Sequence, residues 1–526
     1  MKADALVTIP SRWVLASCLG ISLLIAALPT PLPVSILALE LALTILGLFL
    51  FGSIRYRIDK NALTYGALLI IFATFYPHSS IKEDIASQGI IVFFAQTLPR
   101  LFSLTFLEKL FHADTMLFIL GLTFFVSVIA QTRMLEDLCM RILRLTQGQV
   151  YKTVAIIITL VAIASGIMDG VSMIGLTLRV LVFILIMAKM DAKDIEFVIM
   201  ISVIVTTLCG IGMAYGEPPN LIAKSNLGLP DSFFLIYTMP LAVVSLILVI
   251  LSLYPRLRAA RIPIDTLDPL AQYIAEVRFD QVKQYGQIIE SEQQSPEQQS
   301  KVPRMTVEQL HAIRQQRERA AFWGQIAFAP FILLLFAHAT LHTIPLFFSS
   351  FAGFLVASIG IRSYPLMTKR VLHDAIDEYK EYLFLFPLFL SMTMLVEVGI
   401  FDVLKTGIEQ GVAVLGTAPM AGIQFIVSGL VSAALDNNVV ADFASRAIGG
   451  MPDMFLFAAA QIAGYATGGA LTHIGSAQSV IAYAYILRHI NPHFTPFQWV
   501  QAVWKLIGVI ALVLLGALYL MAMILA

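Results

Sequence analysis

Nine long apolar runs constrain the fold of this chain more than any other feature of its sequence. They lie at about residues 12–29, 33–52, 61–77, 114–131, 232–254, 320–343, 344–361, 381–400 and 497–525. A helix needs roughly 17–25 apolar residues to cross ~30 Å of hydrocarbon, and these runs are of that order. Apolar residues make up 58% of the chain and charged residues only 13%, against roughly 45–50% and about 25% in soluble domains. The sequence therefore predicts an all-α polytopic membrane protein.

Two further regions, 151–188 and 413–449, each carry an aspartate inside an apolar segment. In both, a serine precedes the aspartate by four positions and an arginine follows it by ten: Ser165, Asp169 and Arg179 in the first, Ser432, Asp436 and Arg446 in the second. Each region is too long for one clean span and is broken at the motif. Because non-helical backbone at membrane depth is tolerated only where it is buried or lines a wet cavity, each region is predicted to be a re-entrant helical hairpin.

A second pair of broken segments follows the two hairpins. Residues 195–227 are interrupted at Gly216-Glu-Pro-Pro-Asn220, and residues 451–487 are interrupted between Gly468 and Gly475. Proline and glycine at mid-span free backbone groups that can face a ligand. Corresponding broken segments in two halves are typical of a secondary transporter with inverted-topology repeats and a site at their interface. These two discontinuous helices and the nine plain spans predict about 11 crossings.

The chain is predicted to have five parts. They are N-terminal scaffold helices (1–113), a first transport repeat (114–254), a hydrophilic cytoplasmic connector (255–319), second-half scaffold helices (320–380) and a second transport repeat (381–526). Residues 78–113 can form an interfacial helix or a further crossing. Inside the connector, the Gln/Ser-rich stretch 292–300 is predicted to be disordered and 304–320 to form a surface helix. The distribution of Lys and Arg predicts an inner (cell) membrane protein with a cytoplasmic N-terminus and an outside C-terminus.

Asp169 and Asp436 are the strongest candidates for an ion site, because an ionisable group at membrane depth is costly unless it is paired or hydrated. The alternative is that each pairs with its arginine or caps the returning helix. Ten residues along a helix give ~15 Å of rise and roughly 280° of rotation, which suits a direct pair poorly. Two carboxylates, with Asn437 as a further oxygen ligand, favour a hard cation such as Na⁺. A proton can compete for the same carboxylates, which would couple opposite movements of Na⁺ and H⁺.

Other polar residues at the tips and breaks are candidates for lining the site: Ser165, Ser172, Glu217, Asn220, Ser432, Asn438, Thr472, His473 and Ser476. Two of them have plain alternatives, because Glu217 can cap the helix that follows it and His473 can be a packing histidine. Arg179 and Arg446 are expected to be structural charge partners. Asp442 either extends the second tip or pairs with Arg446.

Several other functions are not supported by the sequence. The net charge is zero, so composition gives no sign of a nucleic-acid partner. The three cysteines lack the spacing of a metal site. No phosphate-cradling loop, nucleotide motif or hydrolase signature occurs, so the chain is predicted not to be an enzyme and to need no cofactor. Its expected partners are the lipid bilayer and a small inorganic cation.

The first-half motifs, Met168–Ser172 and Gly216–Lys224, resemble those of NhaB-type sodium/proton antiporters. The second-half motifs, Leu435–Asn437 and Gly468–Ala477, look like those of NhaD-type antiporters and related members of the ion transporter superfamily. This resemblance covers roughly residues 114–525. It implies a Na⁺(Li⁺)/H⁺ antiporter, in which Asp169 is the first-half cation ligand and Asp436 with Asn437 is its second-half counterpart.

The same resemblance implies a scaffold domain through which such proteins form homodimers. The superfamily also holds arsenite and dicarboxylate carriers. The alternative function is therefore a carrier of dicarboxylate, citrate or arsenite, either coupled to Na⁺ or uncoupled. A non-transporting scaffold is a weaker hypothesis, because it gives no reason for mirrored acidic breaks in the two halves.

Overall fold

The computed structural model describes residues 7–53, 56–132, 134–168, 170–263, 307–341, 344–380 and 382–525. Each of the nine predicted apolar runs coincides with a helix: α1 (Ser11–Ala26), α2 (Ser35–Ser53), α3 (Lys60–Phe75), α7 (Ala113–Thr132), α14 (Met239–Leu257), α17 (Val307–Leu341), α18 (Phe347–Ile361), α20 (Leu385–Glu397) and α26 (Pro496–Leu525). The described residues are nearly all helical, and the protein is a polytopic membrane protein as predicted. By length and hydropathy, six described helices can cross a membrane, or seven if one bent pair counts as a span.

The remaining elements complete the order of the chain. They are η1 (Tyr76–His78), α4 (Ser80–Gln88), α5 (Ile90–Arg100), α6 (Leu104–Phe111), α8 (Met134–Leu145), α13 (Asp231–Phe233), the π-helical η2 (Phe234–Thr238), α19 (Pro365–Lys380) and α21 (Ile400–Leu415), besides the helices of the two repeats given below. Within residues 78–113, α5 and α6 meet at a bend of 100°. With 11 and 8 residues, each is too short to cross ~30 Å of hydrocarbon alone.

Two short strands are an exception to the all-helical prediction. Strand β1 (Val7–Ile9) pairs in parallel with β2 (Tyr56–Ile58), and the strands lead into α1 and α3, which pack against each other. Asp59 joins these two helix starts: its carboxylate accepts from the Asn61 amide at 2.9 Å as the N-cap of α3 and from the Ser11 hydroxyl at 2.9 Å. A run of three residues is too short for its pairing to be visible in sequence.

The connector differs from its prediction at its C-terminal end. The predicted surface helix 304–320 and the following span form one continuous helix, α17, of 35 residues. Its first turns contain good helix formers such as Glu, Gln, Arg and Ala and no glycine or proline, so nothing ends the helix before the apolar segment begins. The stretch 292–300, predicted to be disordered, lies outside the described residues.

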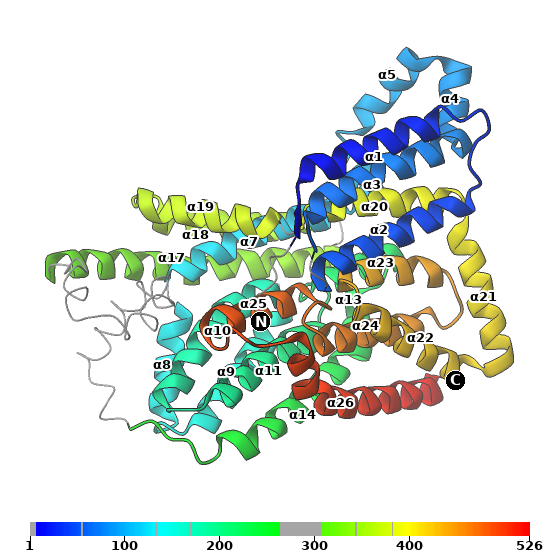
Figure 1. Cartoon of the computed structure of the whole chain (residues 1–526). Helices are drawn as coiled ribbons and strands as arrows, with labels where there is room; N and C mark the ends of the chain where they lie inside the picture. Colours follow the sequence, from blue (N-terminus) through cyan, green and yellow to red (C-terminus); the bar gives the residue numbers. More distant parts are fainter. Residues whose placement is uncertain are drawn as a thin grey trace.

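Two groups of long helices frame the rest of the molecule (Figure 1). Helices α7, α17, α18 and α19 run side by side at the upper left, and α1, α2, α3 and α20 lie together at the upper right. The helices that contain the predicted breaks occupy the lower part of the same view. They include parts of both halves of the sequence, which are in contact with each other through α11 and α24.

The two regions predicted to repeat have the same order of helices. The first contains α9 (Val150–Ser165), α10 (Gly170–Met187), α11 (Ala192–Gly210) and α12 (Pro218–Leu227); the second contains α22 (Thr417–Ser432), α23 (Asn437–Ile448), α24 (Met454–Leu471) and α25 (Ala477–His489). The helices stop at the two aspartate motifs and at the two Gly-rich or Pro-rich breaks. Glycine or proline lies at the first tip and at both breaks, whereas the second tip contains neither and α23 begins there with Asp436 as its N-cap.

Equivalent contacts hold the breaks of the two halves together. A side chain at Gly216 would collide with the Ser165 carbonyl oxygen, and one at Gly475 would collide with that of Ser432. Each break glycine therefore packs directly on the end of the preceding hairpin helix, where only glycine leaves room. A polar side chain four residues later then ties the break to the helix before it: Asn220 donates to the Gly210 carbonyl at 3.1 Å, and Ser479 donates to that of Gly469 at 2.8 Å.

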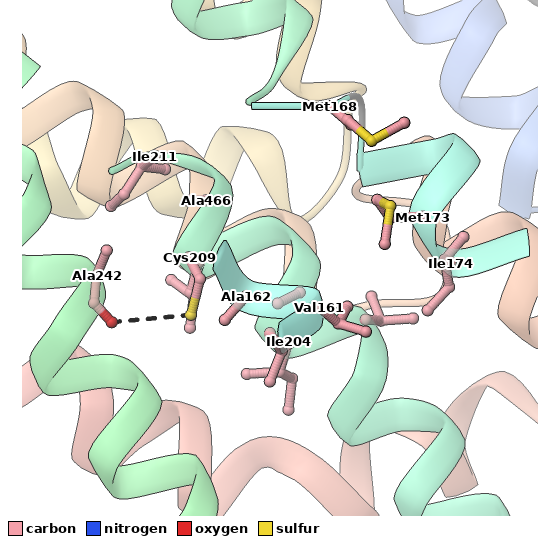
Figure 2. Close-up of a cluster of buried hydrophobic side chains, with 14 of the residues drawn as sticks. Val161, Ala162, Met168, Met173, Ile174, Ile204, Cys209, Ile211, Ala242 and Ala466 are labelled. Atoms are coloured by element: carbon pink, nitrogen blue, oxygen red, sulfur yellow. Dashed lines mark hydrogen bonds between the residues drawn. The ribbon is translucent and has the colours of Figure 1, made fainter. Parts of the chain in front are cut away.

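Small residues let the helices of the second half approach closely. A Cβ at Gly464 would meet the Phe425 carbonyl, and one at Gly468 would meet the Gly429 carbonyl, so α24 lies backbone to backbone against α22. This i, i+4 glycine spacing is a common way to pack helices in lipid, where burial of apolar surface gives little driving force. Around α9, α10, α11 and α14 the packing is apolar instead, and Figure 2 shows Ile204, Cys209 and neighbouring side chains filling this region.

Candidate functional site

A small pocket lies where the breaks of both halves meet. It is lined by Val171, Glu217, Pro218, Pro219, Tyr382, Asp436, Asn437, Asn438, Ser476, Ala477 and Gln478. Most of these residues are at the starts of four helices, α10, α12, α23 and α25, whose N-terminal ends converge here. The cavity has a volume of about 10 Å³, which is room for about one water molecule.

Glu217 is a buried acid in this pocket, with a side chain 3% exposed. The side-chain amide of Gln478 donates to both of its carboxylate oxygens, at 2.7 and 2.9 Å. Although Glu217 is the N-cap residue of α12, its side chain makes no capping hydrogen bond, so the alternative that it only caps that helix is wrong. Its carboxylate instead crosses from the first half to a residue of the second half.

Asp436 is the second acid of the pocket and caps α23. Its Oδ1 accepts from the backbone N–H of Asn438 at 2.9 Å and from the Asn438 side-chain amide at 2.7 Å. The alternative that it pairs with Arg446 is wrong, because Arg446 donates through Nε to Asp442 at 2.8 Å. The charge of Lys60, at the start of α3, acts electrostatically on Asp436. Asp436 therefore caps α23, as one of the alternatives proposed, and its carboxylate also lines the pocket.

The two asparagines after Asp436 supply amide groups to the same wall. Asn438 is 5% exposed, and its side-chain oxygen Oδ1 is buried with no hydrogen-bond partner among the described residues. A buried polar atom without a partner is costly and points to a missing ligand or water. Asn437 is held more fully: its amide nitrogen can donate to the carbonyls of Tyr465 at 3.1 Å and Gly475 at 2.8 Å.

Each half has one large polar side chain near the pocket, but the two side chains come from different segments: from the break in the first half and from the hairpin tip in the second. In the first half Glu217, from the break, fills the space beside Gly210 and Gly170. In the second half Asn437, from the hairpin tip, fills the space beside Gly469, and the small Ser476 lies at the position of Glu217. A large residue on one segment thus requires a small one on the other, which is why the two breaks differ in sequence while their backbones make equivalent contacts.

Several predicted residues lie near the pocket without lining it. Buried Ser165 donates to the Ala162 carbonyl at 3.0 Å, within its own helix. Asn220 donates to two carbonyls of the first break and accepts from the Tyr465 hydroxyl at 2.6 Å. Ser432 contacts the Asn437 amide and donates to the Tyr465 carbonyl at 2.9 Å. These residues hold the breaks in place.

Three residues of the second break have local roles. Thr472 donates to the Ala433 carbonyl at 2.6 Å, which ties the break to the hairpin tip. The ring of His473 packs against Tyr483, with centroids 4.6 Å apart, as the packing alternative proposed. Ser476 caps α25 and lines the pocket.

The first hairpin tip can be followed only in part. Asp169 and the side chains of Ser172 and Arg179 lie outside the described residues, so their predicted roles stay predictions. Their neighbours do reach the site: a Cβ at Gly170 would collide with Glu217 and Gln478, and Val171 lines the pocket. The start of α10 therefore lies against the Glu217–Gln478 pair.

Sequence reasoning missed Gln478, Tyr382 and Lys60. A signal for Gln478 existed, because it stands in the first turn of α25, three residues after the glycine that matches Gly216. Lys60 and Tyr382 lie far from the motifs in sequence and reach the site only through the packing of the scaffold helices.

Several known proteins are similar in sequence to this chain. The 46 kDa membrane protein of Mycobacterium leprae is 23% identical over 381 residues, 70% of this chain and 77% of that protein. An uncharacterized transporter of Mycobacterium tuberculosis is 26% identical over 144 residues, which spans 27% of this chain and only 33% of that transporter. The P protein of Homo sapiens is 25% identical over 124 residues, 24% of this chain and 14% of that protein.

One protein family matches most of the chain in sequence. The citrate transporter family CitMHS matches residues 5–463, which include the first hairpin, both scaffold regions, the second hairpin and part of α24. Its range contains Glu217 and Asp436 from the two walls of the pocket. The chain therefore belongs to the CitMHS family of citrate transporters.

Proposed function

We propose that this protein is a secondary active transporter that exchanges Na⁺ or Li⁺ for protons at the pocket between its two halves. One observation carries the proposal: two acids, Glu217 and Asp436, line this pocket together with the unpartnered, buried oxygen of Asn438. Carboxylate and amide oxygens are the ligands that hard cations prefer. Among the described lining residues there is no lysine or arginine to attract an anion instead.

The size of the pocket agrees with a small cargo. A volume of about 10 Å³ holds about one water, and so fits a dehydrated metal ion far better than a tricarboxylate. Gln478 and the amides of Asn438 stabilise the two carboxylates by hydrogen bonds. An arriving cation would take over part of that stabilisation from these donors.

Exchange follows if a cation and a proton compete for the same acids. A carboxylate that has bound a proton has no charge left to hold Na⁺, so only one of the two can occupy the site at a time. If the site faces either side of the membrane only when it is occupied, Na⁺ moves one way and H⁺ the other. Movement of one repeat against the other around a fixed site would supply the alternating access, with Asp169 contributing a third carboxylate from the first tip.

Citrate carriage coupled to a cation is a second candidate, and two observations favour it. Four helix N-termini converge on the pocket, each equivalent to roughly half a positive charge, which suits an anion. The family to which the chain belongs is described as citrate transporters. In this alternative the acids would hold the coupling cation while the helix starts bind carboxylates of the substrate in a more open state.

Transport into proteoliposomes distinguishes the two candidates. With an acid interior and a pH-sensitive dye, external Na⁺ or Li⁺ should dissipate the pH gradient in the absence of citrate. Asp436→Asn should abolish this, and because asparagine caps helices as well as aspartate does, the variant should remain folded. Asp402→Asn, at an exposed position of α21, is the matched control and should transport normally. Uptake of labelled citrate with no effect of Na⁺ alone on the gradient would favour the second candidate.

The setting of this activity is part of the proposal. We place the transporter in an inner (cell) membrane, with the N-terminus in the cytoplasm and the C-terminus outside, following the distribution of its basic residues. Two copies associate through the scaffold helices. Protease protection of tags fused to each end, in membrane vesicles of known sidedness, tests the orientation.

A further inference from the structure

A second group of polar residues, most of them partly or fully buried, lies away from the pocket, where the junction of α6 and α7 meets α12 and α23. It comprises Glu108, His112, Ser225, Asn226, Asp442, Ser445 and Arg446. His112 is 4% exposed and Asp442 is fully buried. Nothing in the exchange mechanism above uses this group, although burying the Asp442 carboxylate, beside Glu108 and Arg446 whose side chains are 28% and 14% exposed, is costly in a membrane protein.

His112 lies between the two carboxylates of the group. Its Nδ1 is 3.6 Å from Oε1 of Glu108, and its Nε2 is 3.5 Å from Oδ1 of Asp442. Both separations are longer than a good hydrogen bond. The other oxygen of Asp442, Oδ2, is buried and has no hydrogen-bond partner among the described residues. On the other side, the Ser225 hydroxyl lies 3.2 Å from Nδ1 and itself donates to Glu108 Oε1 at 2.9 Å. The ring therefore has acceptor oxygens on both sides, with the two carboxylates slightly beyond hydrogen-bond distance.

The charges around His112 favour uptake of a proton. Glu108 from α6 and Asp442 from α23 are the acids that face it, and Arg446 from α23 is the cation, with Nη2 3.4 Å from Nε2 of the ring. Helix α12 contributes only the neutral Ser225 and Asn226, and α20 contributes the Phe389 ring, 4.8 Å from the imidazole between centroids. Asp114 of α7 directs its carboxylate to the N–H groups of residues 346 and 347 instead.

With His112 neutral, the group carries one net negative charge, because two carboxylates face a single arginine. Protonation of the ring removes that net charge, which is favourable in a medium of low dielectric constant. It also changes partners. A neutral ring can accept from Arg446 at Nε2, whereas a protonated ring must donate there, and Asp442 is the acceptor within reach. Protonation would thus draw the His112 ring toward the Asp442 carboxylate and away from the Arg446 guanidinium, both of which lie on α23.

The same two helices connect this group to the pocket. Helix α12 starts at the pocket and reaches Asn226 after about 12 Å, and α23 starts there and reaches Asp442 after about 8 Å, at 1.5 Å per residue. Asn226 joins the two, because its amide donates to Asp442 Oδ1 and to the Ser445 hydroxyl, both at 2.7 Å. A shift of α23 relative to α12 at the histidine would therefore move Asp436 relative to Glu217.

We propose that His112 is a second proton-binding site of this transporter, and that its protonation, through Asp442, adjusts the position of α23 against α12 and so the affinity of the pocket. The inference deepens the proposed function and rests on it for the identity of the cargo. Proton binding by His112 itself does not depend on what the pocket transports. The two claims can therefore fail separately.

Nuclear magnetic resonance of the full-length protein in lipid nanodiscs tests proton binding directly. The chain has nine histidines, so labelling histidine ring nitrogens with ¹⁵N gives few signals, and His112→Gln identifies the one that belongs to His112. We expect this signal to change from neutral to doubly protonated between about pH 8 and pH 5, the range in which histidine changes charge. In Asp442→Asn, which removes one flanking carboxylate, the change should occur at lower pH.

Transport measured over the same pH range tests the coupling. In the wild type, the rate of Na⁺-driven proton release should change across this pH range as His112 titrates. In His112→Gln, the change in that rate should be at least tenfold smaller. His373→Gln is the control, because His373 is exposed on α19 and also faces a carboxylate, that of Asp377 at 3.3 Å, and its profile should match wild type. A His112 signal that keeps one charge state throughout, or a His112→Gln profile that superimposes on wild type, would overturn the inference.

If the wild type fails to exchange Na⁺, the proposed function falls, and the pH profile is then measured on uptake of labelled citrate. The resonance of His112 still decides whether it binds a proton. A failure of exchange and a failure of proton binding by His112 are thus read from different measurements.

Discussion

Replacing Glu217 by glutamine tests whether the pocket binds a cation through its buried acids. The substitution keeps the shape of the side chain and removes one charge from a site whose side chain is 3% exposed. Two unit charges about 4 Å apart interact by about 4 kcal/mol at an effective dielectric constant of 20. At 1.36 kcal/mol for each factor of ten, Glu217→Gln should raise the KM for Na⁺ roughly a thousandfold.

The assay is Na⁺-driven dissipation of a pH gradient in proteoliposomes, over a range of Na⁺ concentrations at one pH. Glu409→Gln, at an exposed position of α21, is the matched control and should leave KM unchanged. A second variant uses the contact with Gln478, whose amide lies 2.7 and 2.9 Å from the two carboxylate oxygens. Adding Gln478→Glu to Glu217→Gln moves the charge across this contact and should recover part of the lost affinity.

The reasoning is refuted if Glu217→Gln binds and exchanges Na⁺ with a wild-type KM. It is also refuted if Glu217→Gln and Glu409→Gln raise KM equally, because the effect would then come from net charge rather than from the pocket. Comparable amounts of each variant in the membrane, measured by immunoblot, establish that the comparison is between folded proteins.

Three other substitutions probe the surroundings of the pocket. Gly468→Ala places a Cβ against a carbonyl oxygen of α22 and should lower the free energy of unfolding by about 1–3 kcal/mol. The control is Gly516→Ala, whose Cβ would meet no atom within 4 Å and which should not destabilise the protein. Thermal unfolding in detergent measures both. Tyr465→Phe removes a 2.6 Å hydrogen bond between the two halves and should cost about 0.5–1.5 kcal/mol in the same assay. Lys60→Met removes the cation that acts on Asp436, so the KM for Na⁺ should fall; an increase would contradict a cation site there.

Local sequence patterns predicted much of the fold. Each apolar run forms a helix because, in a membrane, a single segment of that length can hydrogen-bond all of its backbone N–H and C=O groups only as a helix. The breaks at Gly216 and Gly475 followed from residues that cannot continue a helix or that leave room for close approach. The matching positions of Ser165 and Ser432 in the two motifs indicated that the two hairpins are equivalent, and the structure agrees: a break glycine packs on the carbonyl of each serine.

Contacts between distant segments were beyond the reach of the sequence. The pairing of Glu217 with Gln478 depends on how the two halves dock, and no pattern near either residue indicates it. Lys60 reaches Asp436 through scaffold packing. The strand pair, the bend between α5 and α6 and the continuity of α17 likewise arise from short or neutral sequences with weak local preferences.

The polar group around His112 also combines a local contact that the sequence could predict with long-range contacts that it could not. The pairing of Asp442 with Arg446 was one of two alternatives, because i, i+4 residues on a helix are neighbours, and the structure confirms it at 2.8 Å. The approach of His112 and Glu108 from another helix was not predictable. Asp169 remains a predicted ligand, and the crossing number and the inversion of the repeats remain predictions too.

Binding of ²²Na⁺ to the purified protein tests the central claim, a cation held between acids of the two halves. The account predicts binding that Li⁺ and protons displace and that is lost in Glu217→Gln and in Asp436→Asn, each acting alone. It predicts wild-type binding in Glu409→Gln and Asp402→Asn. Binding of ²²Na⁺ that survives both pocket substitutions, or that is absent from the wild type while labelled citrate binds without sodium, would contradict the claim.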